Sequence, residues 1–572
     1  MCAPYERVAV SLARTRFLLS SSRLWVSSCR PRHILRSSTF KSITAKRPLS
    51  SSSNFSSTRS KQPKKSMADS IRISSLEQKI FDTLKAVLVH FQLNVQLRVA
   101  GGWVRDKLLG KECHDIDIAL EDMLGKAFCD KVNEYFISIN QQARNVSVIQ
   151  SNPDQSKHLE TARMKIFGVE IDFVNLRAET YAENSRIPSM KFGTPEEDAL
   201  RRDLTINSLF YNINTGSVED FTGRGLSDLC KGIIATPLPP KTTFLDDPLR
   251  VLRAVRFAAR FDYIMQEDLR EAAANLDVRT ALLNKISPER VGVEIDLMIS
   301  GANPVRAMQE LVDLDLFWVV FRLPQELKNN IPYELKRLCL GTFKAMFEVL
   351  ALFGAPKLTP DQRRIGFYAA LLLPLKPFNL TRKNKQIPVA STIMRDSLKL
   401  RTQDANVVVD LHNAADGLTN VLKVLFDEEK ENLDNAEAED WEVASQSRKM
   451  IRTGLWIGDI KELWRVALLL ESLTESTVGI YLQTQQVKEK ADRCLAAEAA
   501  IINLGLENVW ELKPLLNGKD IMSELGLEKG GPEIKEWQMQ IRKWQLCHMQ
   551  ATVEECLEWF RGQCSNKRRR CS

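Results

Sequence analysis

The segment Ala100-Gly101-Gly102-Trp103-Val104-Arg105-Asp106, followed by Asp115-Ile116-Asp117, decides the fold of this chain. Residues 95–100 predict a short buried strand, and the glycine pair predicts a turn at which backbone can approach an anion closely. Residues 103–109 predict a helix whose N-terminus favours phosphate, with Arg105 one turn inside it. Together these elements predict a site for a nucleoside triphosphate in an α/β domain.

Asp115 and Asp117 alternate with apolar residues, as on a half-buried strand, which puts both carboxylates on one face. Two like charges this close need a cation between them. Carboxylate oxygens suit Mg2+, which keeps several waters and takes substrate phosphates as ligands. The pair therefore predicts a two-metal site that stabilises the attacking and leaving oxygens of an in-line displacement.

A third carboxylate is expected from residues 164–174, which predict one strand. Glu170 and Asp172 fall on one face of it, and we assign the third catalytic carboxylate to Asp172, with Glu170 as the alternative. A glycine pair or an Asp-x-Asp motif alone is more often a plain turn or a solvated strand edge. The prediction therefore depends on the ordered combination.

A second polar cluster follows in Arg201-Arg202-Asp203-Leu204-Thr205-Ile206-Asn207. We expect its two arginines, aspartate and asparagine to share a helical stretch beside the apolar residues. Such a set can bind ribose hydroxyls and a triphosphate.

These motifs resemble those of the class II tRNA nucleotidyltransferases, the eukaryotic and bacterial type of enzyme that adds cytidine, cytidine and adenosine to tRNA 3′ ends. The resemblance covers nearly all of residues 75–560. Its five motifs, in the family's order, are 101–117, 201–207, Glu219-Asp220-Phe221-Thr222-Gly223 with Asp228-Leu229-Cys230-Lys231-Gly232, Asp246-Asp247-Pro248-Leu249-Arg250, and Ser287-Pro288-Glu289-Arg290-Val291 ending near Glu294.

The resemblance implies a polymerase-β-like α/β nucleotidyltransferase head followed by an all-α neck, body and tail. It implies tRNA as partner, CTP and ATP as substrates, Mg2+ as cofactor and pyrophosphate as product. By the same resemblance, Asp115 and Asp117 hold Mg2+, and Asp172 helps to activate the tRNA 3′ hydroxyl. The nucleotide-binding residues are Gly101, Gly102, Arg105, Arg202, Asp203, Asn207, Asp247, Arg250, Arg253 and Arg256.

The resemblance also implies that Asp247 and Arg250 read the incoming base in place of a template. Asp247 only accepts hydrogen bonds and Arg250 only donates them. Cytosine and adenine present an amino donor beside a ring-nitrogen acceptor, whereas uracil and guanine present the reverse, so this pair suits CTP and ATP. The simpler interpretation, in which Asp247 caps a helix that has Pro248 at its first position, is compatible with this role.

The helix expected after Pro248 carries Arg250, Arg253, Arg256 and Arg260 in one stripe opposite apolar residues. By itself such a stripe is often a solvated face. Beside the other motifs, it predicts that Arg253 and Arg256 bind phosphates.

The polar, Pro- and Gly-punctuated residues 180–195 predict a loop of the kind that moves. In the related enzymes a loop here is associated with the final adenosine step, so its presence favours complete CCA addition. Arg186 and Lys191 are candidate contacts within it.

Two alternatives remain. A bacterial-type poly(A) polymerase shares the paired aspartates and the 201–203 motif, but its Gly-Arg/Lys-Arg-Phe signature is absent from residues 122–165. The other alternative is a catalytically silent RNA-binding protein on the same fold, against which the intact Asp115, Asp117, Arg105 and Asp247 argue.

The net charge of +8 is unevenly distributed. Residues 1–66 contain fourteen Lys or Arg, seventeen Ser and one acid, Glu6, which is typical of a mitochondrial or chloroplast transit peptide; a disordered RNA-binding arm is the alternative. The remaining chain has 66 basic and 71 acidic residues, so a tRNA site must be a local patch.

A start at Met67 would give a cytoplasmic or nuclear form, and the basic run 567–570 is a weak candidate for nuclear localisation. This combination favours a plant-type enzyme that serves organelle, cytosol and nucleus.

Periodicity and composition divide the chain into a transit or disordered segment 1–66, a head 67–235, a helical neck 236–300, a helical body 301–430, a helical tail 431–564 and a basic end 565–572. The resemblance implies that the neck selects the nucleotide and that the tail binds tRNA. The acidic stretch 427–440 predicts an exposed connection. Within the tail, residues 517–521 and 530–534 resemble the related enzymes, while three tryptophans at helical spacing favour core positions over base stacking: Trp537, Trp544 and Trp559.

No apolar stretch is long enough to cross a membrane, so no membrane partner is expected. The eleven cysteines form no Cys-x-x-Cys motif and are expected to be reduced thiols. His114 is expected to be a hydrogen-bonded neighbour of Asp115, not a metal ligand. Whether the protein is a monomer or a homodimer stays open.

Overall fold

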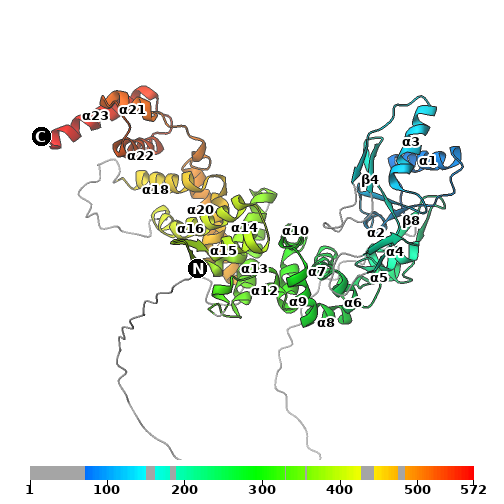
Figure 1. Cartoon of the computed structure of the whole chain (residues 1–572). Helices are drawn as coiled ribbons and strands as arrows, with labels where there is room; N and C mark the ends of the chain where they lie inside the picture. The colour runs from blue at the N-terminus through cyan, green and yellow to red at the C-terminus, as the bar shows by residue number, and fades with distance from the viewer. Residues whose placement is uncertain are drawn as a thin grey trace, which may run out of the picture. The chain divides into compact units, whose positions relative to one another are not determined.

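The computed structural model describes residues 71–149, 161–180, 189–328, 330–354, 357–426, 444–474 and 484–571. They belong to one compact unit, which begins at Lys65. The predicted presequence, Met67, the acidic stretch 427–440, Arg186 and most of the loop around it lie outside the described residues. The expected fold class is confirmed, with a mixed sheet and helices first and a mostly helical region after them (Figure 1).

The head is built on a seven-stranded sheet in the order β3-β4-β5-β2-β1-β8-β9. The pair β2·β5 is parallel and the other neighbouring pairs are antiparallel. In register, Asp117 of β2 lies opposite Asp172 of β5. The bounds are β1 Leu97–Ala100, β2 Ile116–Leu120, β3 Val146–Ile149, β4 Thr161–Ile166, β5 Val169–Asn175, β8 Phe210–Asn212 and β9 Ser217–Glu219.

The single strand expected over residues 164–174 is wrong, because this run belongs to a hairpin of β4 and β5. Phe167 and Gly168 form the turn with φ angles of 48° and 88°. Backbone in this region cannot continue a strand, and Gly168 tolerates it because it lacks a Cβ. The alternation within β5 is as predicted, since Ile171 and Phe173 are buried while Glu170 is exposed.

Three helices of the head are α1 (Ser75–His90), α2 (Gly102–Leu108) and α3 (Gly125–Ser138). Ser74 and Glu77 form a capping box at the start of α1. The buried Glu77 also accepts hydrogen bonds from Trp103 Nε1 and Lys107 Nζ, at 3.0 and 2.9 Å. This carboxylate therefore fixes α1 against the helix that begins at the glycine turn.

The continuous helix expected over residues 201–207 is also wrong. The helix α4 (Pro195–Leu200) ends before Arg201, and only a 3-10 turn, η2 (Thr205–Asn207), follows. Beyond the end of α4, the Asp203 carboxylate accepts a hydrogen bond from the backbone N–H of Leu204 at 2.8 Å, a local interaction of the kind that competes with helical hydrogen bonding.

The loop expected over 180–195 is ordered at both ends. Here β6 (Arg177–Thr180) and β7 (Ser189–Phe192) pair antiparallel. Lys191 lies on β7 and is exposed. Further on, α5 (Gly225–Lys231) leads into β10 (Ile233–Ile234), which pairs in parallel with β11 (Ile264–Met265).

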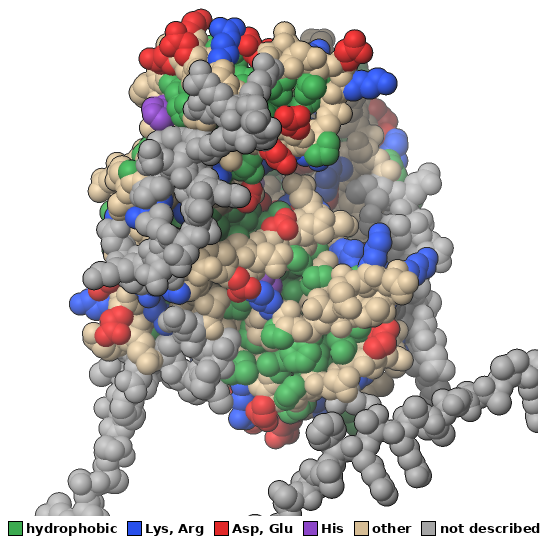
Figure 2. All heavy atoms as spheres, turned by 90° about the vertical axis from the view of Figure 1, so that its left-hand side faces the viewer, with side chains coloured by type: hydrophobic (Ala, Val, Ile, Leu, Met, Phe, Trp, Pro, Cys, Tyr) green, Lys and Arg blue, Asp and Glu red, His purple; other side chains and the backbone are tan. Residues whose placement is uncertain are grey.

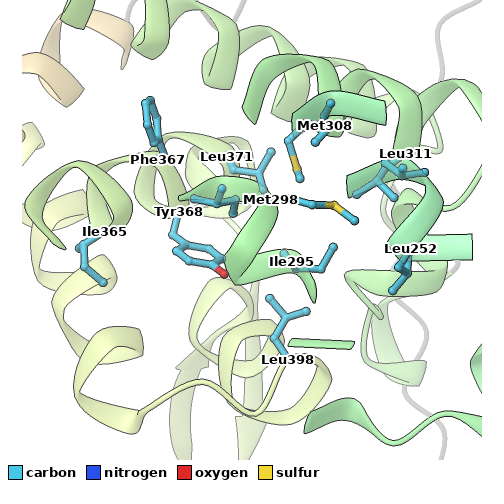
Figure 3. Packing of buried hydrophobic residues seen from close by; sticks show 14 of the residues in the cluster. Leu252, Ile295, Met298, Met308, Leu311, Ile365, Phe367, Tyr368, Leu371 and Leu398 are labelled. Carbon is cyan, nitrogen blue, oxygen red and sulfur yellow. The ribbon is translucent and has the colours of Figure 1, made fainter. Parts of the chain in front are cut away.

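The neck and the start of the body share one hydrophobic core (Figure 3). Leu252 of α7 and Met298 of α10 lie near Leu311 of α11 and Leu371 of α14, so residues far apart in sequence form one packed layer. The helices are α6 (Pro240–Asp246), α7 (Leu249–Phe261), α8 (Glu267–Ala274), α9 (Leu276–Lys285), α10 (Pro288–Ile299), α11 (Pro304–Asp313), α12 (Phe317–Val320), α13 (Leu335–Phe353) and α14 (Pro360–Leu372).

A short hairpin of β12 (Asn379–Arg382) and β13 (Lys385–Pro388) interrupts the helical pattern expected in the body. Its turn residues Lys383 and Asn384 both have positive φ. The later helices are α15 (Val389–Thr392), α16 (Thr402–Leu425), α18 (Ser445–Ile460), α19 (Trp464–Thr474) and α20 (Thr484–Asn503).

The C-terminal helices α21 (Gly518–Leu525), α22 (Pro532–Cys547) and α23 (Val553–Cys571) pack around a second, smaller core. Trp537 and Trp544 are each 7% exposed, and Trp559 stacks on Trp544 with 5.3 Å between ring centroids. The core interpretation of these tryptophans is confirmed. On the face in Figure 2, acidic and basic side chains are interspersed, without a broad patch of one sign.

Within the described residues, no helix is long and apolar enough to span a membrane. The cysteines described there are free thiols, as expected.

Gly292 allows α10 to pass close to the backbone at Leu398. A Cβ at Gly292 would lie 1.8 Å from the carbonyl oxygen of Leu398. We expect Gly292→Ala to lower the free energy of unfolding by about 1–3 kcal/mol, because α10 must shift. The matched control is Gly562→Ala in α23, where a Cβ meets nothing within 4 Å and stability should hold. Equal melting temperatures for the two variants would contradict this.

Candidate active site

A polar cleft of about 630 Å³ collects residues from the head sheet, the α4–η2 segment and the neck helices. Seven arginines line it, and they outnumber its five aspartates. Such a surface suits a polyanion that also requires a cation. The charged residues are Arg105, Arg177, Arg201, Arg202, Arg250, Arg253, Arg290, Asp117, Asp172, Asp198, Asp203 and Asp247.

The carboxylates predicted to hold metal lie at the start of β2. Asp117 lines the cleft, while Asp115 is exposed and directly precedes the strand. Burial raises the pKa of Asp117 to about 6, and the charges of Asp115 and Asp172 add to this effect. The excess negative charge here is what a divalent cation would relieve.

Asp172 also lines the cleft, but a cation of the protein already engages it. Arg163 of β4 donates from Nε to Oδ1 at 2.6 Å and from Nη2 to Oδ2 at 2.8 Å. Glu170, the alternative third carboxylate, is 63% exposed on its side chain and lies 3.7 Å from Arg163. Of these two acids, only Asp172 faces the cleft.

The residues fit an ion that takes most of its ligands from water and substrate. Within the described ranges, no group of three or more Asp, Glu, His or Cys side chains is placed to hold a metal ion. Asp115 and Asp117 supply two carboxylates, and Mg2+ requires few protein ligands when phosphates complete its shell. His114 is exposed and belongs to no such group.

Gly101 and Gly102 lie at the cleft wall, where α2 begins. Gly101 has a φ of 68°, and a Cβ there would lie 2.7 Å from Arg202 Nη1 and 3.2 Å from the carbonyl oxygen of Asn207. The missing side chain therefore lets the Arg202 guanidinium lie against the turn. Arg202 also lies over the Phe210 ring, 4.9 Å from its centroid.

Sequence reasoning missed Asp198, although it organises the arginines around it. One oxygen accepts from Arg202 Nε and Nη2 at 3.0 and 2.7 Å, and the other accepts from Arg201 Nε at 2.9 Å. Burial would raise the pKa of Asp198, but the charges of Arg202 and Arg201 outweigh it and lower the pKa to about 2. The spacing of three and four residues between Asp198 and the arginines was the available signal.

Arg105 lies in the cleft wall but is deeply engaged. Its guanidinium donates two hydrogen bonds to Asp106, each 2.9 Å long, and one to Asn207 Oδ1. It also lies 5.0 and 4.9 Å from the centroids of the Phe257 and Phe261 rings of α7. Arg105 therefore joins α2 to η2 and α7, in addition to facing the predicted triphosphate position.

Asp203 connects the head to the neck. It accepts from Asn207 Nδ2 at 3.1 Å and from Arg253 Nε at 2.6 Å. Burial would raise the pKa of Asp203, but the charge of Arg253 lowers it overall. The predicted sugar-binding residues Asp203 and Asn207 thus hold each other and the first turns of α7.

Arg253 and Arg256 differ in position, although both were expected to bind phosphate. Arg253 lines the cleft, whereas Arg256 is outside the cleft lining and donates to the buried Glu294 of α10 at 2.6 Å. Both arginines lie on α7, but only Arg253 reaches the cleft lining. Arg256 therefore serves as an internal ion-pair partner. Glu294 is a second residue of the site's support that the sequence did not single out.

Asp247 and Arg250 both line the cleft, as the base-reading hypothesis requires. Asp247 Oδ1 accepts from the backbone N–H of Leu249 at 3.1 Å. The predicted N-cap role of Asp247 is wrong, because α7 begins at Leu249 with Pro248 as its N-cap, and Asp247 is instead the C-cap of α6. Its Oδ2 accepts from Arg290 Nη2 at 2.9 Å. Arg290 also lines the cleft and was quoted only as part of a motif in the sequence.

Two family models match this chain. One, described as "Poly A polymerase head domain", matches residues 97–235, and one described as "Probable RNA and SrmB- binding site of polymerase A" matches residues 266–327. The mitochondrial CCA tRNA nucleotidyltransferase of Saccharomyces cerevisiae is 36% identical over 494 residues, covering 81% of this chain and 87% of the yeast protein. Poly(A) polymerase I of Salmonella typhi is 32% identical over 252 residues, covering 41% of this chain and 49% of that enzyme.

A solved structure of a CCA-adding enzyme in its apo form II has the same fold. It superposes with a TM-score of 0.56 at 20% sequence identity, covering 86% of this chain and 97% of that one. The likeness therefore extends beyond the head to the helical region.

The raised pKa of Asp117 predicts a pH-dependent stability cost. Between the unfolded pKa near 3.8 and the folded value of about 6, the folded state binds more protons, so stability falls as pH rises through this window. We expect the free energy of unfolding of Asp117→Asn, measured by denaturant titration, to exceed that of wild type by about 1–3 kcal/mol above pH 6.5. Near pH 4 the two proteins should differ little. Added divalent cation should reduce this difference in the free energy of unfolding, because it stabilises the wild type. A gap independent of pH would contradict this assignment.

Gly101 and Gly110 provide a matched test of the turn, because both have a φ of 68°. Alanine is strained at both positive-φ positions, and at Gly101 the ψ of −112° lies outside the left-handed region. Only at Gly101 does the new Cβ meet Arg202. We expect Gly101→Ala to weaken nucleoside triphosphate binding roughly 10- to 100-fold, since a displacement of about 1 Å can have this effect. Gly110→Ala should bind within about two-fold of wild type. Similar losses in both variants would assign the effect to strain.

Proposed function

This chain belongs to the family of CCA tRNA nucleotidyltransferases, and from that premise we propose that it adds cytidine, cytidine and adenosine to tRNA 3′ ends without a template. CTP and ATP are the substrates and pyrophosphate is the product. The observation that carries the proposal is the single cleft, in which Asp117 and Asp172 share a wall with seven arginines and with the base-reading candidates Asp247 and Arg250.

The arginines of the cleft are arranged for a triphosphate. Asp198 fixes Arg201 and Arg202 from behind, while Gly101 lets Arg202 approach the turn. Guanidinium groups held in place in this way present their remaining donors to phosphate oxygens with little loss of side-chain entropy. Asn207 and Asp203 stand beside them at the expected sugar position, supported by Arg105 and Arg253.

Base selection is proposed to come from Asp247 with Arg250. Arg290 and the Leu249 N–H hold the Asp247 carboxylate, so its acceptor direction is fixed before a nucleotide binds. An amino group of cytosine or adenine can donate to this carboxylate, and Arg250 can donate to the neighbouring ring nitrogen. Uracil and guanine would leave buried groups unpaired, which is the kind of mismatch that gives strong selection.

Nucleotidyltransferases of this kind generally use a divalent metal ion. We propose Mg2+, held by Asp115 and Asp117, which when bound neutralises the triphosphate and activates the tRNA 3′ hydroxyl. Asp117 must be ionised for this role, and nearby acids make that costly in the free protein. Asp172, one strand away in register, is proposed to orient the hydroxyl.

Poly(A) polymerase is the second candidate, because a head-domain model of that name matches residues 97–235. The bacterial poly(A) polymerase aligns with only 49% of its own length, however, whereas the yeast CCA enzyme aligns with 87%. CCA addition is therefore favoured. The silent RNA-binding alternative is disfavoured because Arg105, Asp117 and Asp247 line one cleft.

The remaining assignments are proposals of the same kind. The head is assigned to 67–235, the nucleotide-selecting neck to 236–300, the body to 301–430 and the tRNA-holding tail to 431–564. A mitochondrial location is supported by the transit-like residues 1–66 and by the mitochondrial yeast relative. A chloroplast form is proposed from residues 1–66 alone. Cytoplasmic and nuclear forms are proposed from a start at Met67, and the nuclear form also from the basic run 567–570.

The test incubates the full-length protein with Mg2+, each labelled nucleoside triphosphate and a tRNA that lacks its last three nucleotides. We expect three additions that require CTP and then ATP, with no use of UTP or GTP. Asp115→Ala and Asp117→Ala should each lose roughly 10³-fold in rate, because the metal supplies several kcal/mol and each 1.36 kcal/mol is a factor of ten.

The control variant is Asp130→Ala, which removes an exposed carboxylate on α3, away from the cleft, and should add CCA normally. Long adenosine tails would favour poly(A) polymerase. Binding of tRNA without extension, by well-folded wild type, would favour the silent RNA-binding protein.

A further inference from the structure

Three charged side chains lie in a row across neighbouring strands of the head sheet. Asp117 of β2 is opposite Asp172 of β5, and Asp172 is opposite Arg163 of β4. Residues in register on adjacent strands share a face, with side chains about 5 Å apart at the Cβ atoms. Arg163 therefore stands beside the carboxylates to which the cation of the reaction is assigned.

Arg163 holds Asp172 through both carboxylate oxygens, at 2.6 and 2.8 Å. Its hydrogen bond to Asp172 raises the pKa of the guanidinium, and the charges of Asp172, Glu170 and Asp115 contribute in the same direction. Arg163 thus lies within a group of acids that includes one of the proposed metal ligands.

The pair is placed so that it can open. The Arg163 side chain is 45% exposed and that of Asp172 is 18% exposed, while the apolar neighbours Ala162 and Met164 on β4 are fully buried on the other face. Exposed ion pairs contribute about 0–1 kcal/mol of net free energy, and a bidentate Arg–carboxylate pair such as this one lies at the stronger end of that range. The packing of β4 does not require Arg163, and a competing cation can displace its guanidinium from Asp172.

We propose that Arg163 is a positioning residue for the divalent cation, holding Asp172 in the ion-free cleft and releasing it when the cation enters. This inference rests on the proposed function. It gives Asp172 two exchangeable partners, the guanidinium and the metal ion. No covalent bond is made or broken in the exchange: the two hydrogen bonds from Arg163 are given up, and Asp172 keeps a cationic partner throughout.

A consequence is that Arg163 weakens cation binding, because the ion must compete for Asp172. Removing the guanidinium would free both Asp172 oxygens for the ion or its waters. The effect is specific to this pair, so replacing Asp172 should matter for cation affinity more when Arg163 is absent than when it is present.

The experiment measures Mn2+ binding to the full-length protein without nucleotide, using the electron paramagnetic resonance signal of free Mn2+. We expect Arg163→Gln to bind Mn2+ about two- to five-fold more tightly than wild type, a range set by the strength of exposed ion pairs. Asp172→Asn should weaken binding clearly in the Arg163→Gln background and only slightly in wild type. Arg163→Lys, which keeps the positive charge, should bind Mn2+ with nearly the weaker affinity of wild type.

The matched control is Lys165→Gln, which removes one positive charge from the same exposed face of β4, next to Glu170 in register. Its Mn2+ affinity should stay within about 1.5-fold of wild type, since an exposed charge farther from the site is screened. An equal gain for Lys165→Gln and Arg163→Gln would overturn the proposal, and so would equal effects of Asp172→Asn in both backgrounds.

Failure of this inference can be told apart from failure of the proposed function. If wild type adds CCA but Arg163→Gln binds Mn2+ with unchanged affinity, Arg163 has no positioning role and the function stands. If wild type does not add CCA, the proposed function fails, and the inference fails with it.

Discussion

The ion pair between the buried Asp203 and the partly exposed Arg253 is the interaction on which the cleft depends. Asp203 follows α4 of the head, and Arg253 lies on α7 of the neck. The hydrogen bond from Arg253 Nε to Asp203 Oδ2 is 2.6 Å long. From this pair, hydrogen bonds extend through Asn207 to Arg105 and Asp106 on one side, and Arg253 lies 3.7 Å from Glu294 on the other. Removing one partner of such a network leaves an uncompensated buried charge, which is costly.

The same network explains why several predicted ligand contacts also support the fold. Arg105, Asp203 and Asn207 bind one another before any nucleotide arrives, and Arg256 is fully committed to Glu294 and Phe257. Buried ion pairs add little to stability compared with apolar packing, but they fix relative orientation. Here they set the distance between the head and α7, which carry the residues proposed to bind the phosphates and to read the base.

The carboxylate wall of the cleft shows the opposite arrangement. Burial and two neighbouring acids raise the pKa of Asp117, while Arg163 offsets the charge of Asp172 directly. Such an arrangement costs folding stability in the ion-free protein, and it is typical of sites whose charge is completed by substrate and metal. The site therefore combines arginines that are already paired with carboxylates of the protein and two acids, Asp115 and Asp117, whose charge a bound cation would balance.

The sequence by itself determined the fold class, the glycine turn, the alternation of Asp115 and Asp117, and about half of the residues that line the cleft. These are local features, because strand alternation, turn glycines and motif order are written in consecutive residues. Only the tertiary structure decided which of them meet. It replaced one expected strand with the β4–β5 hairpin, moved Arg256 out of the cleft, brought Asp198 and Arg290 into its lining, and placed Arg163 beside Asp172. The reason is physical, since long-range register and the direction of each side chain on α7 follow from packing against distant segments, which local periodicity does not encode.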